Sequence, residues 1–545
     1  MKKPKKNWLD YASIIALGGV FLILVVLNIG WGNNWIDSDM AAEMIFSKLL
    51  AEEGKFIATA DWYYSTEFRI LYTQLVMGIL HRFCSNWHTI RVITNIVFYI
   101  LMLGSFYFVC KPLQIKKRNI RLCALALFVP VSEAVMTHLQ MGNTYMSHVI
   151  LCFLTFGLFL RISDQTCHIK HKKSILYGIC YVVLCVILGV SGVRYMLDLL
   201  VPFVLAAMIL CMQSKSFQRF RRQPSKEHLL LCAKSGQARY LYTAIVGAVT
   251  GCVGYLINIL YISKIYQFQT YDATNFIKVY GNEGVFMERV QNAVGQLLQM
   301  FGYIENKSFL SLRGLITMLA FVMIAGLGFA WYKSLQYAQK KEELETEQEH
   351  RTITVLFAGV SFVLHLFVFI FTTSTMVDRY FIPIAIFFLL VLAIYMEWEE
   401  LAFDRVALCM VLGACLSLAG LKTYFSFLTN DKNASRYEVA SYLVEEGYSF
   451  GYASYWNSNI MTEVSNGALE MANLWSLESL GDFKWSSKMS SYEPKEGKVF
   501  LIASKDELGA LEQYDMLEKQ TVIFENEDYT VLHFDSQEQF LEYRE

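Results

Sequence analysis

Residues 11–39 read YASIIALGGVFLILVVLNIGW-GNNWI-DSD. The run from Tyr11 to Trp31 carries no charge, and about 20 apolar residues are enough for a helix to cross a bilayer. The segment 1–6 before it is rich in lysine, which predicts that this end stays in the cytoplasm. Asp37 and Asp39 are therefore expected on the outer face, close to the membrane surface.

The composition of the whole chain agrees with a membrane protein. It is 55% hydrophobic and only 17% charged over 545 residues, and the apolar residues come in blocks. The net charge is -1, so there is no excess of basic residues that would indicate a nucleic-acid partner. The 12 cysteines contain no CxxC pair, so neither a disulfide framework nor a zinc ribbon is expected.

Basic residues cluster after alternate apolar runs, near residues 111–121, 161–173, 219–226 and 333–341. The positive-inside rule then predicts about eleven membrane spans, with the N-terminus inside and the C-terminus outside. The first run is long and no A-x-A site follows it, so a cleaved signal peptide is not expected. The predicted spans are 11–31, 91–110, 120–137, 146–161, 174–192, 195–213, 240–262, 310–332, 352–374, 380–397 and 405–425.

The pattern divides the chain into a transmembrane domain, 1–428, with exterior loops 32–90 and 263–308, and an exterior α/β domain, 429–545. The loops are predicted to hold amphipathic surface helices at 39–54, 68–83 and 285–301. The tail is predicted to contain a helix at 436–446, strands at 450–456 and 498–503, and a hairpin over 521–535.

An acidic pair that opens the first exterior loop, followed by a surface helix and many spans, resembles the GT-C superfamily of membrane glycosyltransferases. Within it, the chain is most similar to glycosyltransferase family 39, the protein O-mannosyltransferases and the bacterial lipid A aminoarabinose transferases. In that pattern an Asp-Glu pair begins the helix and a Gly closes it about fifteen residues later. Asp39 and Gly54 fit this spacing, but Met40 stands in place of the second acid, which leaves Asp37 or Glu43 to replace it.

The resemblance implies an inverting transfer of a sugar from a polyprenyl-phosphate donor to a glycan, lipid or protein acceptor. One carboxylate, Asp39 or else Asp37, would act as general base on the acceptor. The leaving phosphate needs cationic positioning, for which a guanidinium is suited. Arg379 and Tyr380 belong to a segment, DRYFIP, that resembles a late Arg-Tyr-x-x-Pro element of these enzymes, and Arg194 also lies at an outer span end.

Each of these residues has a purely structural alternative. Either aspartate can simply cap the following helix. Arg379 can pair with Asp378 or extend to the membrane interface, and Arg194 can be structural. Glu67 follows interfacial aromatic residues typical of a membrane belt, yet it could bind sugar hydroxyls or serve as the second acid.

No cofactor is predicted with certainty. His138 and His148, with Asp39, could hold a divalent metal ion, but their spacing is not that of a tight ligand set.

Taken together, the sequence and its resemblance predict a GT-C glycosyltransferase of the bacterial cytoplasmic membrane that acts on the cell envelope. A transporter or flippase of lipid-linked glycans, and a non-catalytic envelope-assembly protein, are the alternatives. A transporter is expected to show paired repeats and broken helices, and no clear repeat is seen.

Overall fold

The computed structural model describes residues 8–142, 144–164, 171–269, 274–281, 283–308, 310–340 and 346–544. The basic segment 1–6, together with Lys170 and Lys341 of the predicted basic clusters, lies outside these ranges. The other residues of those clusters lie within them.

Ten helical segments in the described ranges are long and apolar enough to cross a membrane, and one bent pair would make an eleventh. This confirms the predicted polytopic helical architecture. The helices that form these ten segments are α1 (Trp8–Trp31), α4 (Trp87–Cys110), α7 (Met146–Ser163), α8 (His171–Ser191), α9 (Val201–Gln213), α12 (Gly236–Ile257), α16 (Leu319–Lys340), α17 (Thr346–Phe371), α18 (Ile382–Trp398) and α19 (Ala402–Thr429).

The bent pair replaces the continuous span expected over 120–137. Helix α5 (Lys117–Phe128) ends before Pro130, and the chain resumes as α6 (Glu133–Val135) and a π-helical turn, η2 (Met136–Met141), at 96° to it. Proline has no N–H to donate to the hydrogen-bond pattern of a helix, and the residue before it disfavours helical backbone angles. A break in the helix near Pro130 is therefore expected. The break turns η2, which carries His138, toward the exterior loops.

Glycine allows two membrane helices to approach closely. Helices α8 and α12 make an extensive contact, in which Gly189 faces Gly251 and Gly254 faces Val186. A Cβ built on Gly189 would lie 1.9 Å from the Gly251 carbonyl oxygen, so any larger residue would push the helices apart. Small residues at such contacts are the usual way in which helices pack inside a bilayer.

The exterior loops fold as predicted in two places and differ in a third. Helix α2 (Ser38–Glu52) matches the expected helix and ends before Gly54, whose φ of +70° only glycine adopts readily. Helix α14 (Glu283–Met300) confirms the helix predicted over 285–301. The helix predicted over 68–83 is wrong in length, since α3 covers only Gln74–Leu80.

The C-terminal residues form a five-stranded sheet in the order β4-β3-β6-β8-β7. Strands β3, β4 and β6 are parallel, whereas β8 is antiparallel to both β6 and β7. The predicted helix, the second strand and the hairpin are confirmed, whereas the strand predicted over 450–456 ends at Ser454, where a helix begins. The elements are α20 (Ala434–Glu445), β3 (Phe450–Ser454), α21 (Tyr455–Val464), β4 (Glu470–Leu474), β6 (Val499–Ser504), β7 (Thr521–Glu525) and β8 (Tyr529–Phe534).

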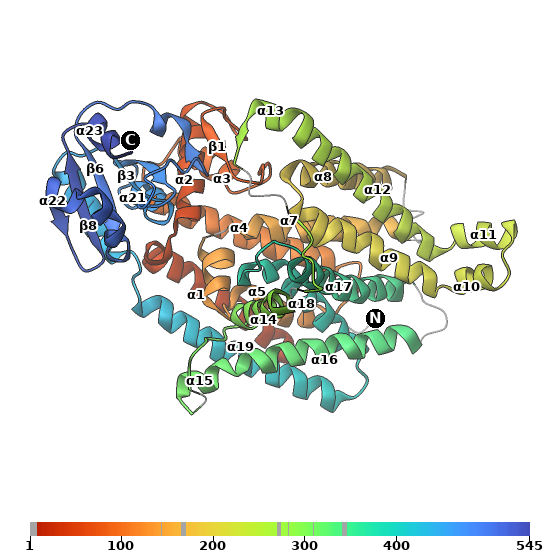
Figure 1. Ribbon diagram of the computed structural model, residues 1–545. Coiled ribbons are helices and arrows are strands. Elements are labelled where there is room, and N and C mark those ends of the chain that lie inside the picture. The colour runs from red at the N-terminus through yellow and green to blue at the C-terminus, as the bar shows by residue number, and fades with distance from the viewer. Residues whose placement is uncertain are drawn as a thin grey trace.

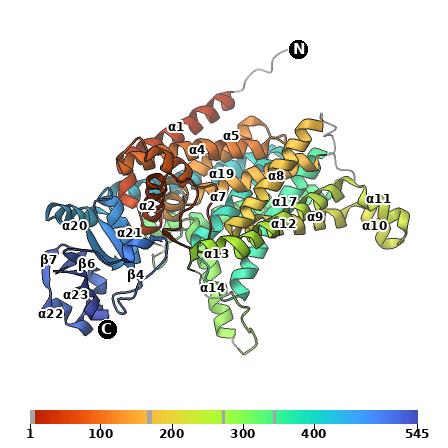
Figure 2. The same ribbon diagram turned by 90° about the horizontal axis from the view of Figure 1, so that it is seen from above.

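The C-terminal domain lies at one end of the helical bundle, and the basic hairpin α10 (Lys215–Arg222) and α11 (Lys226–Ala233) projects from the other (Figure 1). The same separation is visible from above (Figure 2). A second, small sheet joins both exterior loops to the C-terminal domain, because β1 (Trp62–Tyr64) lies between β2 (Gln267–Phe268) and β5 (Ser487–Lys488). Three segments far apart in sequence therefore meet at this end.

Candidate active site

The two aspartates that open the first exterior loop have different positions. Asp37 is the N-cap of α2, and its carboxylate accepts a hydrogen bond from the Met40 N–H at 2.9 Å. Burial, with the nearby charge of Asp39, raises the pKa of Asp37 to about 7. The capping alternative is thus observed for Asp37, whereas Asp39, two residues later, lines the main cavity of the protein.

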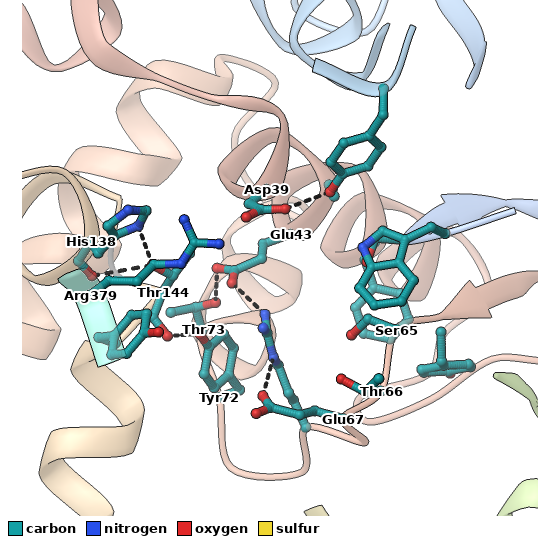
Figure 3. A pocket seen from close by; sticks show the side chains of 18 of the residues that line it. Asp39, Glu43, Ser65, Thr66, Glu67, Tyr72, Thr73, His138, Thr144 and Arg379 are labelled. Carbon is teal, nitrogen blue, oxygen red and sulfur yellow. Dashed lines mark hydrogen bonds and ion pairs between the residues drawn. The ribbon is translucent and has the colours of Figure 1, made fainter. Parts of the chain in front are cut away.

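A tyrosine of the C-terminal domain holds Asp39. The Tyr455 hydroxyl donates to Asp39 Oδ1 at 2.6 Å (Figure 3). The Ser38 hydroxyl in turn donates to the Tyr455 carbonyl at 2.5 Å. Burial and the negative charge of Asp39 both raise the pKa of Tyr455 well above its ordinary value. The tyrosine therefore keeps its proton and acts as a donor, which fixes the orientation of the Asp39 carboxylate.

Glu43 lies one helical turn after Asp39, on the same face of α2. Its carboxylate accepts from Arg69 Nη1 at 2.7 Å and from the Thr73 hydroxyl at 3.0 Å (Figure 3). Burial raises the pKa of Glu43 to about 7, although the Arg69 charge opposes the shift. For Glu67, burial is outweighed by the charges of Arg69 and Arg194, so the pKa of Glu67 is lowered and its carboxylate stays ionised.

The cavity has a volume of about 590 Å³ and lies between the bundle, the first exterior loop and the C-terminal domain. It brings together nearly all the predicted site residues. Those that line it are Asp39, Glu43, Glu67, Arg194, Arg379 and Tyr380. Asp37 is not among them.

Arg379 lies in the short helix η5 (Asp378–Phe381), at the outer start of α18. The Asp378 carboxylate accepts from the Arg379 backbone N–H at 2.6 Å and does not pair with its guanidinium. Within the part of the chain that the structure describes, the Arg379 guanidinium forms no ion pair within 4.0 Å. It projects into the space that Asp39 and Glu43 also face (Figure 3), so a cation without a bound anion stands near the carboxylates.

Arg194, by contrast, is fully engaged. Its Nη2 donates to the Tyr145 hydroxyl at 2.7 Å, and its guanidinium lies 4.4 Å from the Tyr145 ring centroid and 5.1 Å from that of Tyr380. Its Nε also lies 3.6 Å from the buried Asp198. Arg194 is therefore held rigidly at the cavity wall beside Tyr380.

Below this wall, two histidines flank Asp198 inside the bundle. His148 Nε2 lies 2.8 Å from Asp198 Oδ2, and His365 Nε2 lies 3.5 Å from Asp198 Oδ1. His138 contacts the Thr144 hydroxyl at 3.4 Å. Over the described residues, no group of three His, Cys, Asp or Glu side chains is arranged to hold a metal ion.

A second cavity, of about 420 Å³, is an apolar groove between α14, α16, α17 and α18. Phe381, which follows Tyr380 directly, is one of its lining residues, together with Ile384 and Phe388 of α18. Two consecutive residues of the segment that carries Arg379 therefore line the two spaces, Tyr380 the cavity around Asp39 and Phe381 the groove. A chain of apolar character could lie in the groove while its polar end reaches the cavity.

The sequence did not assign a role to Arg69 or foresee that Tyr455 contacts Asp39. Arg69 lies 26 residues from Glu43, and Tyr455 lies 416 residues from Asp39. Arg69 had one detectable signal, a lone cation within a stretch of exterior aromatic residues. No pattern in the sequence around Tyr455 predicts its contact with Asp39, because that contact depends on how the C-terminal domain docks.

Comparison with known proteins gives a structural answer only. No family model and no curated protein matches the sequence. Among solved structures, apo ArnT from Cupriavidus metallidurans superposes with a TM-score of 0.52 at 11% identity, over 96% of this chain and 98% of that one. ArnT bound to undecaprenyl phosphate gives 0.50 at 12% identity, over 95% and 97%.

The oligosaccharyltransferase of Archaeoglobus fulgidus, tethered to an acceptor peptide, also matches, with a TM-score of 0.46 at 11% identity over 92% of this chain and 70% of that one. The match to ArnT extends over almost the full length of both chains, C-terminal domain included. The chain therefore has the GT-C membrane fold, as its sequence predicted.

Proposed function

We propose that this protein is an inverting glycosyltransferase that moves a sugar from a polyprenyl-phosphate donor to a cell-envelope acceptor. The observation that carries the proposal is the cavity in which Asp39 faces Arg379, a cation with no ion pair among the described residues, together with an apolar groove lined by the nearby Phe381. A base, an anion site and a lipid-sized groove are the three elements that such a transfer requires.

In the proposed reaction the acceptor oxygen or nitrogen attacks the anomeric carbon. A bond from the acceptor to the sugar forms while the bond from the sugar to the donor phosphate breaks on the opposite face. The acceptor proton passes to Asp39, which Tyr455 orients through its hydrogen bond. The phosphate leaves as an anion, so it needs positive charge and no proton.

Arg379 is assigned to that phosphate. A guanidinium can hold two phosphate oxygens through paired hydrogen bonds, and no carboxylate in the described part of the chain competes for it. Arg194 and Tyr380 complete this side of the cavity and are assigned to donor binding. Glu43 and Glu67, which anchor Arg69, are assigned to sugar hydroxyls or to positioning.

The polyprenyl chain is assigned to the apolar groove. ArnT, which shares the fold, has been solved with undecaprenyl phosphate bound, and this supports a lipid phosphate as the donor carrier. The groove lies beside the Arg379 segment, so one molecule could occupy both sites. The lipid would then stay in the membrane while its sugar reaches Asp39.

The proposed location is the bacterial cytoplasmic membrane, with residues 32–90, 263–308 and 429–545 outside. The basic hairpin α10–α11 lies at the opposite end of the bundle from the C-terminal domain, as the positive-inside rule requires for this orientation (Figure 1). Protease added to intact spheroplasts should therefore digest the C-terminal domain. If the C-terminal domain is digested only in inverted vesicles, the orientation is the opposite of the proposed one.

Transfer itself is tested with purified protein in nanodiscs, given radiolabelled polyprenyl-phosphate sugars and an envelope extract. We expect the radiolabel to appear in a product that no longer partitions with the lipid. The Asp39→Asn variant should not form this labelled product. A flippase would instead move intact lipid-linked sugar across a vesicle membrane without breaking the sugar-phosphate bond. Such movement without transfer would contradict the proposal.

A further inference from the structure

The C-terminal sheet presents its ligand-binding edge to the cavity. The parallel strands β3, β4 and β6 end at Ser454, Leu474 and Ser504. Ser454, Ser504 and the residue that follows Leu474, Trp475, all line the cavity above Asp39. Open α/β sheets bind their ligands outside the carboxyl ends of parallel strands.

The position along the sheet is also the favoured one. Strands β3 and β6 are neighbours, and β3 leads through α21 to β4 on one side, whereas β6 continues toward β7 and β8 on the other. Connections that diverge from adjacent strands leave a crevice between them, the point at which such sheets bind ligands. Here that crevice opens onto the cavity.

Aromatic rings cover this edge. Trp475, Phe483 and Trp485 form a continuous group, with centroids 4.8 Å apart for Trp475–Phe483 and 6.0 Å apart, at an interplanar angle of 9°, for Phe483–Trp485. Trp475 is 62% exposed and Trp456, on α21, is 55% exposed. Large aromatic side chains left accessible around a cavity mark a binding site.

The polar groups of the same edge are neutral or acidic. Asn457 Nδ2 donates to Ser454 Oγ and to Glu507 Oε2, each at 3.3 Å, and the Ser504 hydroxyl donates to Glu507 Oε2 at 2.7 Å. The C-terminal residues that line the cavity include no Lys, Arg or His. Arg436 donates to Asn457 Oδ1 at 3.0 Å from outside the lining, so the groups of this edge that face the cavity carry no positive charge for a phosphate or a carboxylate.

Rings beside hydroxyl, amide and carboxylate groups suit one ligand class. A carbohydrate presents apolar C–H faces that pack on aromatic rings, and hydroxyls that donate to carboxylates and accept from amides. An extended peptide is commonly bound along the edge of a strand, through main-chain hydrogen bonds. The lining groups here lie at strand ends and are side chains.

We propose that the carboxyl edge of the C-terminal sheet, with Trp475 and Trp485 as its main contacts, is an acceptor site for a neutral carbohydrate chain. This inference rests on the proposed function and names its acceptor class. Tyr455 lies between the two sites, since its ring is 5.4 Å from that of Phe483 and its hydroxyl binds Asp39. A sugar stacked on the rings can place a hydroxyl near the base.

The test uses the full-length protein in nanodiscs and two probes from the envelope of cells that make it. One probe is the deproteinised, delipidated neutral polysaccharide, and the other is the envelope protein digested to peptides. We expect saturable binding of the polysaccharide, weakened about tenfold or more in Trp475→Ala and Trp485→Ala, as for a central aromatic contact. Trp475→Phe, which keeps a ring, should restore part of the affinity.

Val522→Ala is the matched control, since Val522 is exposed on β7, at the far edge of the sheet. It should bind the polysaccharide as the wild type does. Absence of polysaccharide binding, equal binding by Trp475→Ala and wild type, or peptide binding that Trp475→Ala abolishes would each overturn the proposal. Asp39→Asn should still bind the polysaccharide, so loss of transfer with binding intact separates the two proposals.

Discussion

The two walls of the cavity differ in chemistry. The inner wall, formed by the first exterior loop and the bundle, carries Glu43, Glu67, Arg69, Arg194 and Arg379, and most of these charges are paired. The outer wall, formed by the C-terminal domain, is made of aromatic rings, hydroxyls and a single carboxylate. Under the proposed function, this difference suits two unlike ligands, an anionic one against the bundle and an uncharged one against the domain.

Asp39 lies where the two walls meet, so its substitution should have the largest effect. Asp39→Asn keeps the size of the side chain and can still accept the Tyr455 hydrogen bond, but it cannot take a proton. Turnover should fall by roughly 10²–10⁴-fold with folding intact. Initial rates of sugar transfer and a thermal melt measure the two quantities.

The control is Asp37→Asn, because Asp37 caps α2 and does not line the cavity. Asparagine caps a helix as well as aspartate does. Turnover in Asp37→Asn should therefore be close to normal. If it is Asp37→Asn that loses activity, while Asp39→Asn works normally, the base has been assigned to the wrong residue.

The contact between the walls is itself stabilised by a buried ion pair. Arg91 of α4 binds Glu463 of α21 through Nε at 2.8 Å and Nη2 at 2.6 Å, and also donates to the Met40 carbonyl at 3.0 Å. Only 2% and 3% of the Arg91 and Glu463 side chains are exposed. Removing one partner of such a pair leaves the other charge buried.

Glu463→Gln should therefore loosen the C-terminal domain by about 3–5 kcal/mol. Limited proteolysis should release residues 429–545 faster than in the wild type. The control is Glu470→Gln, which breaks a more exposed pair with Lys495 and should cost about 1 kcal/mol or less. Equal protease resistance of Glu463→Gln and wild type would show that the domain is held by its other contacts.

The Arg379→Lys variant tests how the inner wall binds the donor phosphate. Lysine keeps the charge but cannot present the planar pair of donors, so donor affinity should drop by about tenfold, within the range for a hydrogen bond to a charged group. Direct binding of the lipid phosphate to membranes measures this. Arg289→Lys is the control, because the hydrogen bonds of the Arg289 guanidinium within the described residues go to the backbone carbonyls of 369, 373 and 374, and Arg289 lines neither cavity. Unchanged affinity in Arg379→Lys would assign Arg379 a structural role.

The last expected effect concerns the pH dependence of stability. Because the pKa of Asp37 is raised to about 7, the folded protein binds a proton that the unfolded chain releases near pH 4. The resulting stabilisation is present below pH 4 and is lost as the pH rises through 7. Asp37→Asn cannot ionise, so its melting temperature should exceed that of the wild type more at pH 8 than at pH 5. A difference that is the same at both values would refute the shift.

Much of the fold was readable from the sequence because it depends on local signals. Apolar length predicted most of the spans, the spacing from Asp39 to Gly54 predicted α2, and alternation with turn residues predicted the C-terminal strands. The break near Pro130 was the main departure, because hydropathy alone does not show whether a span is straight.

The inner wall was largely predicted, whereas the way in which the outer wall docks against it was not. Charged residues at span ends are conspicuous in an apolar sequence, so Asp39, Glu43, Glu67, Arg194 and Arg379 could be selected as site candidates. Arg91 and Glu463 are 372 residues apart, and each reads alone as an ordinary charge. The rings of the outer wall look like core residues until the direction of the sheet is known.

The docked C-terminal domain has a consequence for biosynthesis. The C-terminal domain follows α19, the last helix in the described residues that is long and apolar enough to cross a membrane, so a ribosome makes the outer wall after the inner one. Until Glu463 reaches Arg91 and Tyr455 reaches Asp39, a nascent chain already inserted in the membrane has Asp39 on a cavity with only its inner wall. Under the proposed function, a chain halted before residue 429 would load donor yet lack a place for the acceptor, so truncated molecules would occupy carrier lipid without transferring its sugar.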